Sequence, residues 1–344
     1  ANGFAYESKG SVYFDINAFK EKHNYGELSG RNVEDLFEFT RQLDGQTDKR
    51  SAADVALWKK ADETHIRRWP SPWSVGFPGW HLECSAMSTK YLGDQFDIHG
   101  GGLDLQFPHH ECEIAQGCAA TGKKPVNYWM HANMLTLNGK KMSKSTGNTL
   151  SPAELFSGEN DKLDKAYSPA VVRFFMMQAH YSSELDFSSD AISAAEKGFT
   201  KLMSTVDALK DLKSSSESSK DVQAYVDSFY NAMNDDFNSP ILIANLFEAS
   251  KFINSVKDGK ESISASDLEF LQKEFNGFVF DVLGLVKESE GANSKMDDVM
   301  SLLMEIRTEA RDKKDWATSD LIRDKLQEAG ITIKDSKDGT SWTL

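Results

Sequence analysis

Three side chains near the middle of the chain have the chemistry of metal ligands. Cys84 lies in an apolar-periodic segment that Gly93 ends in the manner of a helix C-cap. His109 and Glu113 are four residues apart at the start of a second such segment, 109–120, and this spacing puts both on one helix face. A thiolate, an imidazole and a carboxylate suit zinc, and three protein ligands with one open position is the arrangement of catalytic zinc sites. Spacing alone leaves a second interpretation open, a buried structural cysteine beside an exposed histidine and glutamate.

A run of glycines indicates a second candidate site, for a nucleotide. Residues 96–98 predict a short strand, and 99–102 predict a turn in which three glycines let the backbone approach a ligand closely: Gly100, Gly101 and Gly102. Asp104 could accept hydrogen bonds from a ribose, and the first N–H groups of the helix beginning at His109 favour anionic groups. The order strand, glycine turn and helix fits a nucleotide site, although it lacks the G-x-G-x-x-G fingerprint. An ordinary tight turn is the alternative.

A lysine-rich loop is a third candidate, for phosphate. Residues 135–137 are expected to be extended, and Asn138-Gly139 is a strong signal for a type I′ hairpin turn. The sequence KKMSKS follows at 140–145. Lysines on such a loop contact phosphates as point charges and could stabilise charge that develops at an α-phosphate. A solvated surface loop is the alternative for any run of lysine and serine.

Taken together, these motifs resemble those of cysteinyl-tRNA synthetases. Residues 141–145 read KMSKS, which matches the signature of class I aminoacyl-tRNA synthetases letter for letter. The family is also similar, in the same order, to GWHLECSAM at 79–87, FDIHGGGLDL at 96–105, FPHHE at 107–111 and AMNDDFNSP at 232–240. Because the matches run over nearly the whole chain, the resemblance favours the functional interpretation of each motif over its alternative.

The resemblance implies a role for each candidate residue. Zinc ligands are expected at Cys84, His109 and Glu113, with a further cysteine from the half of the fold that precedes these motifs in the family. Trp80 and His99 are expected to line the pocket for the substrate cysteine. The residues expected to bind ATP are Gly100, Gly101, Gly102, Asp104 on the ribose and Lys144 on the phosphates, and the expected catalytic residues are Lys141 and Lys144. The cofactors implied are Zn²⁺, and Mg²⁺ with ATP.

The reaction that the resemblance implies is cysteine–tRNA ligation. ATP activates L-cysteine to cysteinyl-adenylate, the cysteine then passes to tRNA(Cys), and zinc selects the substrate thiol. In the family, a half of the nucleotide-binding fold with the HIGH motif comes first, and no His-x-Gly-His occurs in this sequence. This chain alone is therefore expected to be inactive. Two alternatives stay open, a non-catalytic module that binds RNA or zinc and a cysteine ligase that acts on a small amine.

The fold that the resemblance implies is α/β. It is the second half of a class I Rossmann-like catalytic domain, followed by an α-helical bundle and a small α+β anticodon-binding end. The expected parts are an insertion (connective) region at 1–68, the catalytic half at 69–137, the KMSKS loop with the stem-contact region at 138–188, the bundle at 189–290 and the anticodon-binding region at 291–344. The family usually has arginine where Phe77 stands, a departure from its pattern.

Local patterns place further elements. A hairpin is predicted over 4–14, and a short helix over Val33–Leu43. Ser151-Pro152-Ala153-Glu154 is a capping box with proline at the first helical position, and from Ser189 the apolar period is helical.

The C-terminal end combines helices with local positive charge. Helices are predicted over 296–312 and 316–329, followed by a hairpin across Asp338-Gly339. Trp342 could stack on a base, although a hairpin core is its alternative place. Cationic residues that could contact anticodon phosphates, or form a solvated helix face, are Arg307, Arg311, Lys313, Lys314, Arg323 and Lys325.

Composition limits the classes of partner. The 344 residues carry a formal net charge of −14, which disfavours non-specific binding to nucleic acid, so the tRNA prediction depends on the resemblance. The sequence has no apolar run of about 18 residues and no signal peptide, which predicts no membrane contact. Three cysteines do not make a disulfide framework, and Cys112 and Cys118 are expected to be reduced thiols in a cytoplasmic monomer.

Overall fold

The computed structural model describes residues 2–31, 48–287, 292–328, 331–336 and 339–343. The chain forms two compact units, Ala1–Phe278 and Val279–Leu344. The helix predicted over Val33–Leu43 lies outside the described residues. None of the described helices combines the length and the apolar character needed to cross a membrane.

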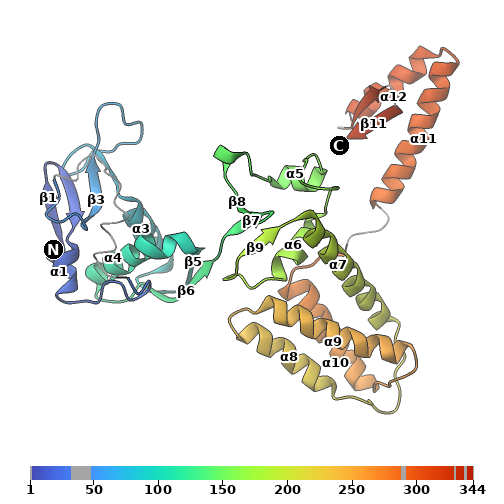
Figure 1. The fold of residues 1–344 in the computed structure, drawn as a ribbon, viewed down its shortest axis with the longest axis horizontal. Helices are drawn as coiled ribbons and strands as arrows, with labels where there is room; N and C mark the ends of the chain where they lie inside the picture. The colour runs from blue at the N-terminus through green and yellow to red at the C-terminus, as the bar shows by residue number, and fades with distance from the viewer. Residues whose placement is uncertain (1, 32–47, 288–291, 329–330, 337–338, 344) are drawn as a thin grey trace. The chain divides into compact units, whose positions relative to one another are not determined.

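An antiparallel sheet opens the first unit (Figure 1). Its strands, in order, are β1 (Ala5–Ser8), β2 (Ser11–Phe14), β3 (Val55–Lys60) and β4 (Gly76–Pro78). The predicted N-terminal hairpin is confirmed, with positive φ angles of 52° at Lys9 and 84° at Gly10 in its two-residue turn. Because β4 pairs with β3, this sheet extends past residue 68, the expected end of the insertion.

The first sheet shares its core with the helix that carries the candidate ligand Glu113. α1 (Ile16–Lys20) begins where Asp15 accepts a hydrogen bond from the Ala18 N–H at 2.9 Å. Side chains of β2, α1, α4 (Glu111–Thr121) and the segments that connect to them form one buried cluster: Phe14, Ile16, Phe19, Tyr25, Ala53, Phe107, Cys112, Ala115 and Ala119. Any shift of the sheet would therefore be felt by α4.

A parallel strand pair joined through α4 follows the first sheet in the chain. β5 (Phe96–Gly102) pairs in parallel with β6 (Val126–Ala132), and α4 lies between them in sequence. α3 (Trp80–Leu92) precedes β5, packs beside α4 and ends at Gly93, as predicted. Parallel strands joined by a helix are the pattern of an α/β fold, so the predicted fold class is confirmed.

The glycine run belongs to β5, and the prediction of a turn at 99–102 is wrong. Gly100, Gly101 and Gly102 pair with residues 130–132 of β6. A ladder needs only backbone groups, and glycine in a strand often marks a close approach by another group. Here the approaching group is an imidazole, because a Cβ on Gly101 would lie 2.6 Å from Cε1 of His110.

A buried carboxylate connects the loop at 26–29 to the start of α4. Glu111 is 1% exposed and accepts hydrogen bonds at 2.9, 3.2 and 3.0 Å from the backbone N–H groups of Gly26, Leu28 and Ser29. The Ser29 hydroxyl donates a fourth bond at 2.9 Å. Since Glu111 lies within 109–113, these bonds hold the backbone that carries the candidate ligands.

A small second sheet carries the lysine-rich loop. Its order is β8 (Lys140–Lys141), β7 (Leu135–Leu137) and β9 (Leu185–Phe187), with β8 antiparallel and β9 parallel to β7. Asn138 and Gly139 have φ angles of 53° and 70°, as the predicted type I′ turn requires. The loop then passes through a 3₁₀ turn before α5 (Pro152–Ser157).

The predicted capping box at the start of α5 is confirmed. The Ser151 hydroxyl accepts from the Glu154 N–H at 3.2 Å, and the Glu154 carboxylate accepts from the Ser151 N–H at 2.7 Å. α6 (Pro169–Met177) also begins with proline, after Ser168 as its N-cap.

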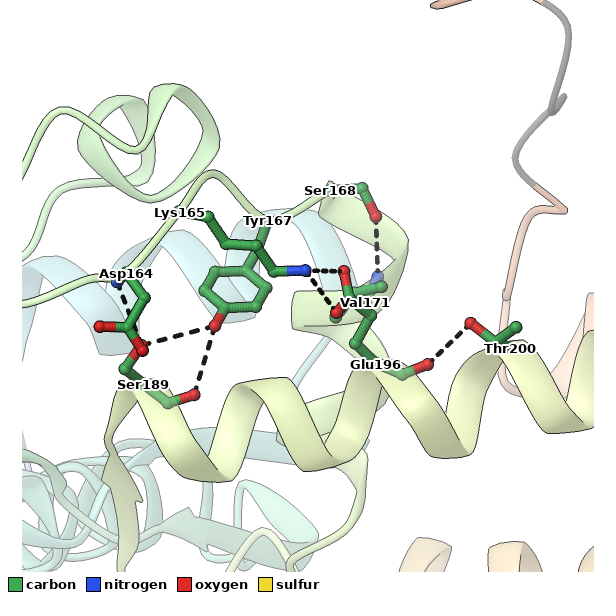
Figure 2. Close-up of polar contacts among 8 residues, drawn as sticks. All are labelled: Asp164, Lys165, Tyr167, Ser168, Val171, Ser189, Glu196 and Thr200. Carbon is green, nitrogen blue, oxygen red and sulfur yellow. Dashed lines mark hydrogen bonds and ion pairs between the residues drawn. The ribbon is translucent and has the colours of Figure 1, made fainter. Parts of the chain in front are cut away.

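The segment between α5 and α6 is bonded to α7 (Ser189–Lys210), as Figure 2 shows. Lys165 Nζ lies 2.8 and 2.6 Å from the two carboxylate oxygens of Glu196. The Ser189 hydroxyl donates to the Asp164 carboxylate at 2.7 Å, and the hydroxyl of the buried Tyr167 donates to the Ser189 carbonyl at 3.3 Å. The chain that follows the lysine-rich loop is therefore anchored on a bundle helix.

The predicted helical bundle consists of α7, α8 (Val222–Asn234), α9 (Ser239–Lys257) and α10 (Ala265–Asn276) (Figure 1). Apolar residues at helical spacing fill its core, and the largest of them include Leu202, Phe229 and Leu246. The α8–α9 turn places Asp236 and Phe237 at φ angles of 53° and 54°. The Tyr181 hydroxyl holds this turn by donating to Asp236 Oδ1 at 2.7 Å.

The second unit pairs two helices with a hairpin. α11 (Ala292–Asp312) and α12 (Trp316–Glu328) precede β10 (Thr332–Ser336) and β11 (Gly339–Thr343), which are antiparallel. Its core contains Met300, Leu326 and Ile331.

The cationic residues predicted for this end do not form one free surface. Arg307 is 5% exposed, so the prediction that it contacts phosphates is wrong. Lys313 pairs with Glu309 at 3.1 Å and Arg323 with Asp320 at 3.3 Å. The two ion pairs have the i,i+4 and i,i+3 spacings that bring residues of neighbouring helical turns together, whereas periodicity does not show what packs over Arg307.

Replacing Glu111 with alanine tests how much its hydrogen bonds to the loop at 26–29 stabilise the protein. We expect Glu111→Ala to lower the free energy of unfolding by about 2–4 kcal/mol, because it leaves partly buried N–H donors without an acceptor. Urea denaturation followed by circular dichroism measures this change. Glu27→Ala is the matched control, since Glu27 makes one exposed pair with Lys124 at 2.8 Å, and its loss should cost at most ~1 kcal/mol. Equal effects of the two substitutions would contradict the assignment.

Candidate metal and nucleotide site

The structure brings the three candidate metal ligands together. The Cys84 thiol comes from α3, His109 from the turn before α4 and Glu113 from the first turn of α4. One ligand atom from each lies within 4.8 Å of the other two. His109 and Glu113 are buried and Cys84 is partly buried, so the group is screened from bulk water.

The protonation state of His109 depends on its neighbours, Glu113 and His81. His109 Nε2 lies 2.8 Å from Glu113 Oε1, while His109 Nδ1 lies 2.6 Å from His81 Nδ1. Burial, followed by the nearby His109, lowers the pKa of His81 to about 4, and burial lowers the pKa of His109 too. Both rings are therefore neutral at pH 7. A proton on His109 Nδ1, donated to His81 Nδ1, would leave the Nε2 lone pair of His109 for a metal ion.

The residues present fit a divalent metal ion. Burial raises the pKa of Glu113 to about 7, and burial, with the nearby Glu113, also raises the pKa of the Cys84 thiol. Within the described residues, the buried Glu113 Oε1 has no hydrogen-bond donor. A cation would supply the missing charge and would favour the deprotonated thiol and carboxyl. The mixed sulfur, nitrogen and oxygen set suits zinc.

A second group of possible ligands shares Glu113. His99, His110 and Glu113 also place ligand atoms within 4.8 Å of one another. His110 Nδ1 lies 2.8 Å from His131 Nε2, and His99 stacks on Trp129 at 4.8 Å between ring centroids. One carboxylate therefore faces imidazoles from two directions.

Sequence reasoning missed His81, His110 and His131, as well as Glu111. Three of these adjoin predicted positions, in Trp80-His81 and in the run 107–113. The remaining one, His131, pairs with Gly101 across the parallel ladder, and no sequence pattern gives that register.

The two residues predicted to line a cysteine pocket lie beside the metal group. The Trp80 ring is 60% exposed, and its centroid lies 4.2 Å from that of His109. His99 Nδ1 lies 3.6 Å from Glu113 Oε2. An aromatic face and an imidazole thus flank the same ligand atoms.

The predicted nucleotide residues fall into two sets. Gly100, Gly101 and Gly102 end β5, and Asp104 follows in the 3₁₀ turn Leu103–Leu105. The Asp104 carboxylate folds over Gly102 in the space that a side chain would fill. The predicted catalytic residues, Lys141 and Lys144, are exposed and lie outside the metal group, Lys141 in β8 and Lys144 in the 3₁₀ turn Lys144–Thr146.

The departure at Phe77 has a local explanation. Phe77 lies in β4 and stacks on His65, with ring centroids 4.5 Å apart and planes 14° from parallel. An aromatic pair therefore occupies the position where the family usually has arginine.

Family models match three stretches of the chain. The model described as tRNA synthetases class I (C) catalytic domain matches residues 1–197. The DALR domain matches 228–287, and the Cysteinyl-tRNA ligase anticodon binding domain matches 297–342.

Curated relatives match over the whole chain. The Cysteine--tRNA ligase of Parabacteroides distasonis is 53% identical over 346 residues, which cover 100% of this chain and 70% of that protein. Those of Bacteroides fragilis and Porphyromonas gingivalis are each 53% identical over 345 residues, covering 99% of this chain and 70% of theirs. Among solved structures, a ternary complex of Agrobacterium radiobacter K84 LeuRS, tRNA and LeuAMS matches with a TM-score of 0.46 and 14% identity over 63% of this chain and 33% of that one, too little to bear on the fold.

The catalytic-domain match extends over more than half of the chain, and the matches to the other two domains follow it in sequence. Together with the 53% identity to named ligases, they show that the chain belongs to the cysteine–tRNA ligase family of class I aminoacyl-tRNA synthetases.

Proposed function

We propose that the chain takes part in joining L-cysteine to tRNA(Cys) in the cytoplasm, with zinc selecting the substrate. The observation that carries the proposal is the convergence of Cys84, His109 and Glu113 beside Trp80 and His99. A metal-ligand group next to an exposed aromatic ring suits an amino acid whose side chain is itself a good metal ligand.

Cys84, His109 and Glu113 would hold the zinc ion, together with the further cysteine that the family resemblance implies. When bound, zinc would act as a Lewis acid that coordinates the substrate thiolate and would bind the hydroxyl of serine far more weakly. A site built around one polar group rejects analogues that lack it by orders of magnitude, which makes a separate editing step unnecessary. Trp80 and His99 would orient the rest of the amino acid.

The chemistry would proceed in two transfers. The cysteine carboxylate attacks the α-phosphorus of ATP, and the bond to the β-phosphate breaks to release pyrophosphate. A terminal ribose hydroxyl of tRNA then attacks the carbonyl carbon, loses its proton and releases AMP. Lys141 and Lys144 would stabilise the phosphate charge, with Mg²⁺ accompanying ATP, and Asp104 would bind the ribose.

Recognition of tRNA would involve the second unit. The anticodon-binding match spans 297–342, which includes α12 and the hairpin of β10 and β11. The exposed Lys314 is one cation there for which an RNA phosphate is an available partner. We expect the protein to act as a monomer. Because Arg307 is buried, the protein's RNA contacts would come from fewer cations than the sequence contains.

Metal content tests the ligand assignment. We expect about one zinc ion per chain in purified protein and a loss of about tenfold or more in zinc affinity for Cys84→Ser, because serine replaces a thiolate with a weak ligand. Metal release followed by a colorimetric chelator measures both. Cys118→Ser is the matched control, since Cys118 is also partly buried and lies outside the metal group. Retention of zinc by Cys84→Ser, or equal loss in both variants, would contradict the assignment.

Cysteine-dependent exchange between ATP and pyrophosphate tests the reaction. For the chain joined to a HIGH-bearing segment, we expect exchange with cysteine and not with serine, and a fall of about 10²–10³ in kcat for Lys144→Ala. The chain alone, which contains no His-x-Gly-His, should give no exchange. Lys140→Ala, a neighbouring exposed lysine, is the control and should stay close to the parent. Zinc binding without exchange in the joined protein would favour the non-catalytic alternative.

A further inference from the structure

The lysines of the loop at 140–145 have no acidic partner within the part of the chain that the structure describes. Lys140, Lys141 and Lys144 are exposed, and their ammonium groups make no ion pair or hydrogen bond among the described residues. Lys165, by contrast, pairs with Glu196 at 2.6 Å. Lys141 and Lys144 can bind one polyanion together only if the backbone presents them to it together, so the support of this loop matters.

Asp186 fixes one side of the loop's stem. Its Oδ1 accepts hydrogen bonds from the Thr136 hydroxyl and from the Gly139 N–H, both at 2.7 Å. The Asn138 N–H adds a bond to the Phe187 carbonyl at 2.9 Å. Both residues of the type I′ turn are thereby attached to β9, although Asp186 itself is exposed.

Asn148 fixes the other side. Its Nδ2 lies 3.2 Å from the carbonyl oxygens of both Lys140 and Lys141, and 3.4 Å from that of Leu137. The backbone carbonyl of Asn148 accepts a hydrogen bond from the Ser143 N–H at 2.9 Å. A carboxamide has two N–H groups, so it satisfies two of these three carbonyls at a time. The start and the end of the loop are joined through this one side chain.

Among the described residues, the tip of the loop at 142–146 makes hydrogen bonds only within the loop itself. The Ser143 and Ser145 hydroxyls lie 2.7 Å apart, and the Thr146 hydroxyl donates to the Ser143 carbonyl at 3.1 Å. Lys162 Nζ reaches the Gly147 carbonyl at 3.3 Å, beyond the tip. The loop thus combines a fixed stem with a tip that can adapt to a ligand.

We propose that Asn148 and Asp186 are positioning residues for the ATP phosphates. They contact no phosphate themselves, and they hold the stem so that Lys141 and Lys144 meet one triphosphate together. The ligand's identity rests on the proposed function, whereas the mechanical role of the two side chains does not. Without either anchor, Lys141 and Lys144 would stay charged and exposed, but the loop would no longer hold both of them in position to contact one triphosphate.

Tryptic cleavage after Lys140, Lys141 and Lys144 tests the mechanical role in the intact protein. We expect Asp186→Ala, Asn148→Ala and Asn148→Asp to raise the cleavage rate of the loop about tenfold, because a released stem opens more often. Asn148→Asp has nearly the same shape and loses both donors. Asp186→Asn keeps an acceptor oxygen and should remain within about twofold of the parent. Unchanged cleavage in Asp186→Ala and Asn148→Asp would overturn the proposal.

A split between Michaelis constants tests the positioning role. In the pyrophosphate exchange assay we expect the same three variants to raise KM for ATP about tenfold, with KM for cysteine and zinc content unchanged. Asp186→Asn should restore parental values. A rise in both Michaelis constants, or a loss of zinc, would show general disruption and would overturn the proposal. If no protein gives exchange, including the parent, the proposed function fails while the cleavage rates still decide whether the two side chains hold the stem.

Discussion

The burial of Glu113 is the constraint on which the rest of this structure depends. Its carboxyl is 3% exposed, with His109 Nε2 at 2.8 Å from one oxygen and His99 Nδ1 at 3.6 Å from the other. Burial lowers the pKa of both imidazoles, so at neutral pH neither offers the full positive charge that an anionic partner needs. A group in this position must take up a proton or a cation. The site therefore fits a metal ion for two reasons: its side chains are metal ligands, and Glu113 has no fully charged cationic partner among the described residues.

Two carboxylates on the same turn of α4 resolve burial in opposite ways. Glu111 is as buried as Glu113 but accepts four hydrogen bonds from the loop at 26–29. Glu113 faces lone pairs and has an oxygen without a donor among the described residues. Satisfied donors make the first carboxylate structural, because nothing is left for a ligand to supply. The second remains available, and the first keeps its backbone in place.

The helical period of 3.6 predicted that His109 and Glu113 lie together, whereas the prediction that Cys84 joins them depended on the family resemblance. The same local rules predicted the type I′ turn at Asn138-Gly139 and the capping box at Ser151. They failed where a partner distant in sequence decides the outcome. A local pattern predicts a turn for the glycines of β5. It does not show that they pair with β6 or that the His110 ring lies against Gly101. Arg307 was placed on the surface because periodicity does not reveal what packs over it.

The two halves of the proposed site call for different degrees of rigidity. Selection between a thiol and a hydroxyl requires ligands held within a fraction of an ångström. His109 and Glu113 lie at the start of α4, which shares a core with the first sheet, and Cys84 lies on α3, which packs beside α4. Phosphate charge changes its position during transfer, so the lysines benefit from a tip that adapts. A loop with mobile lysines and a mobile stem would lose the benefit to entropy, because each lysine would have to be ordered separately. Fixing the stem through Asn148 and Asp186 while leaving the tip to local bonds meets both demands with side chains that need not contact the ligand.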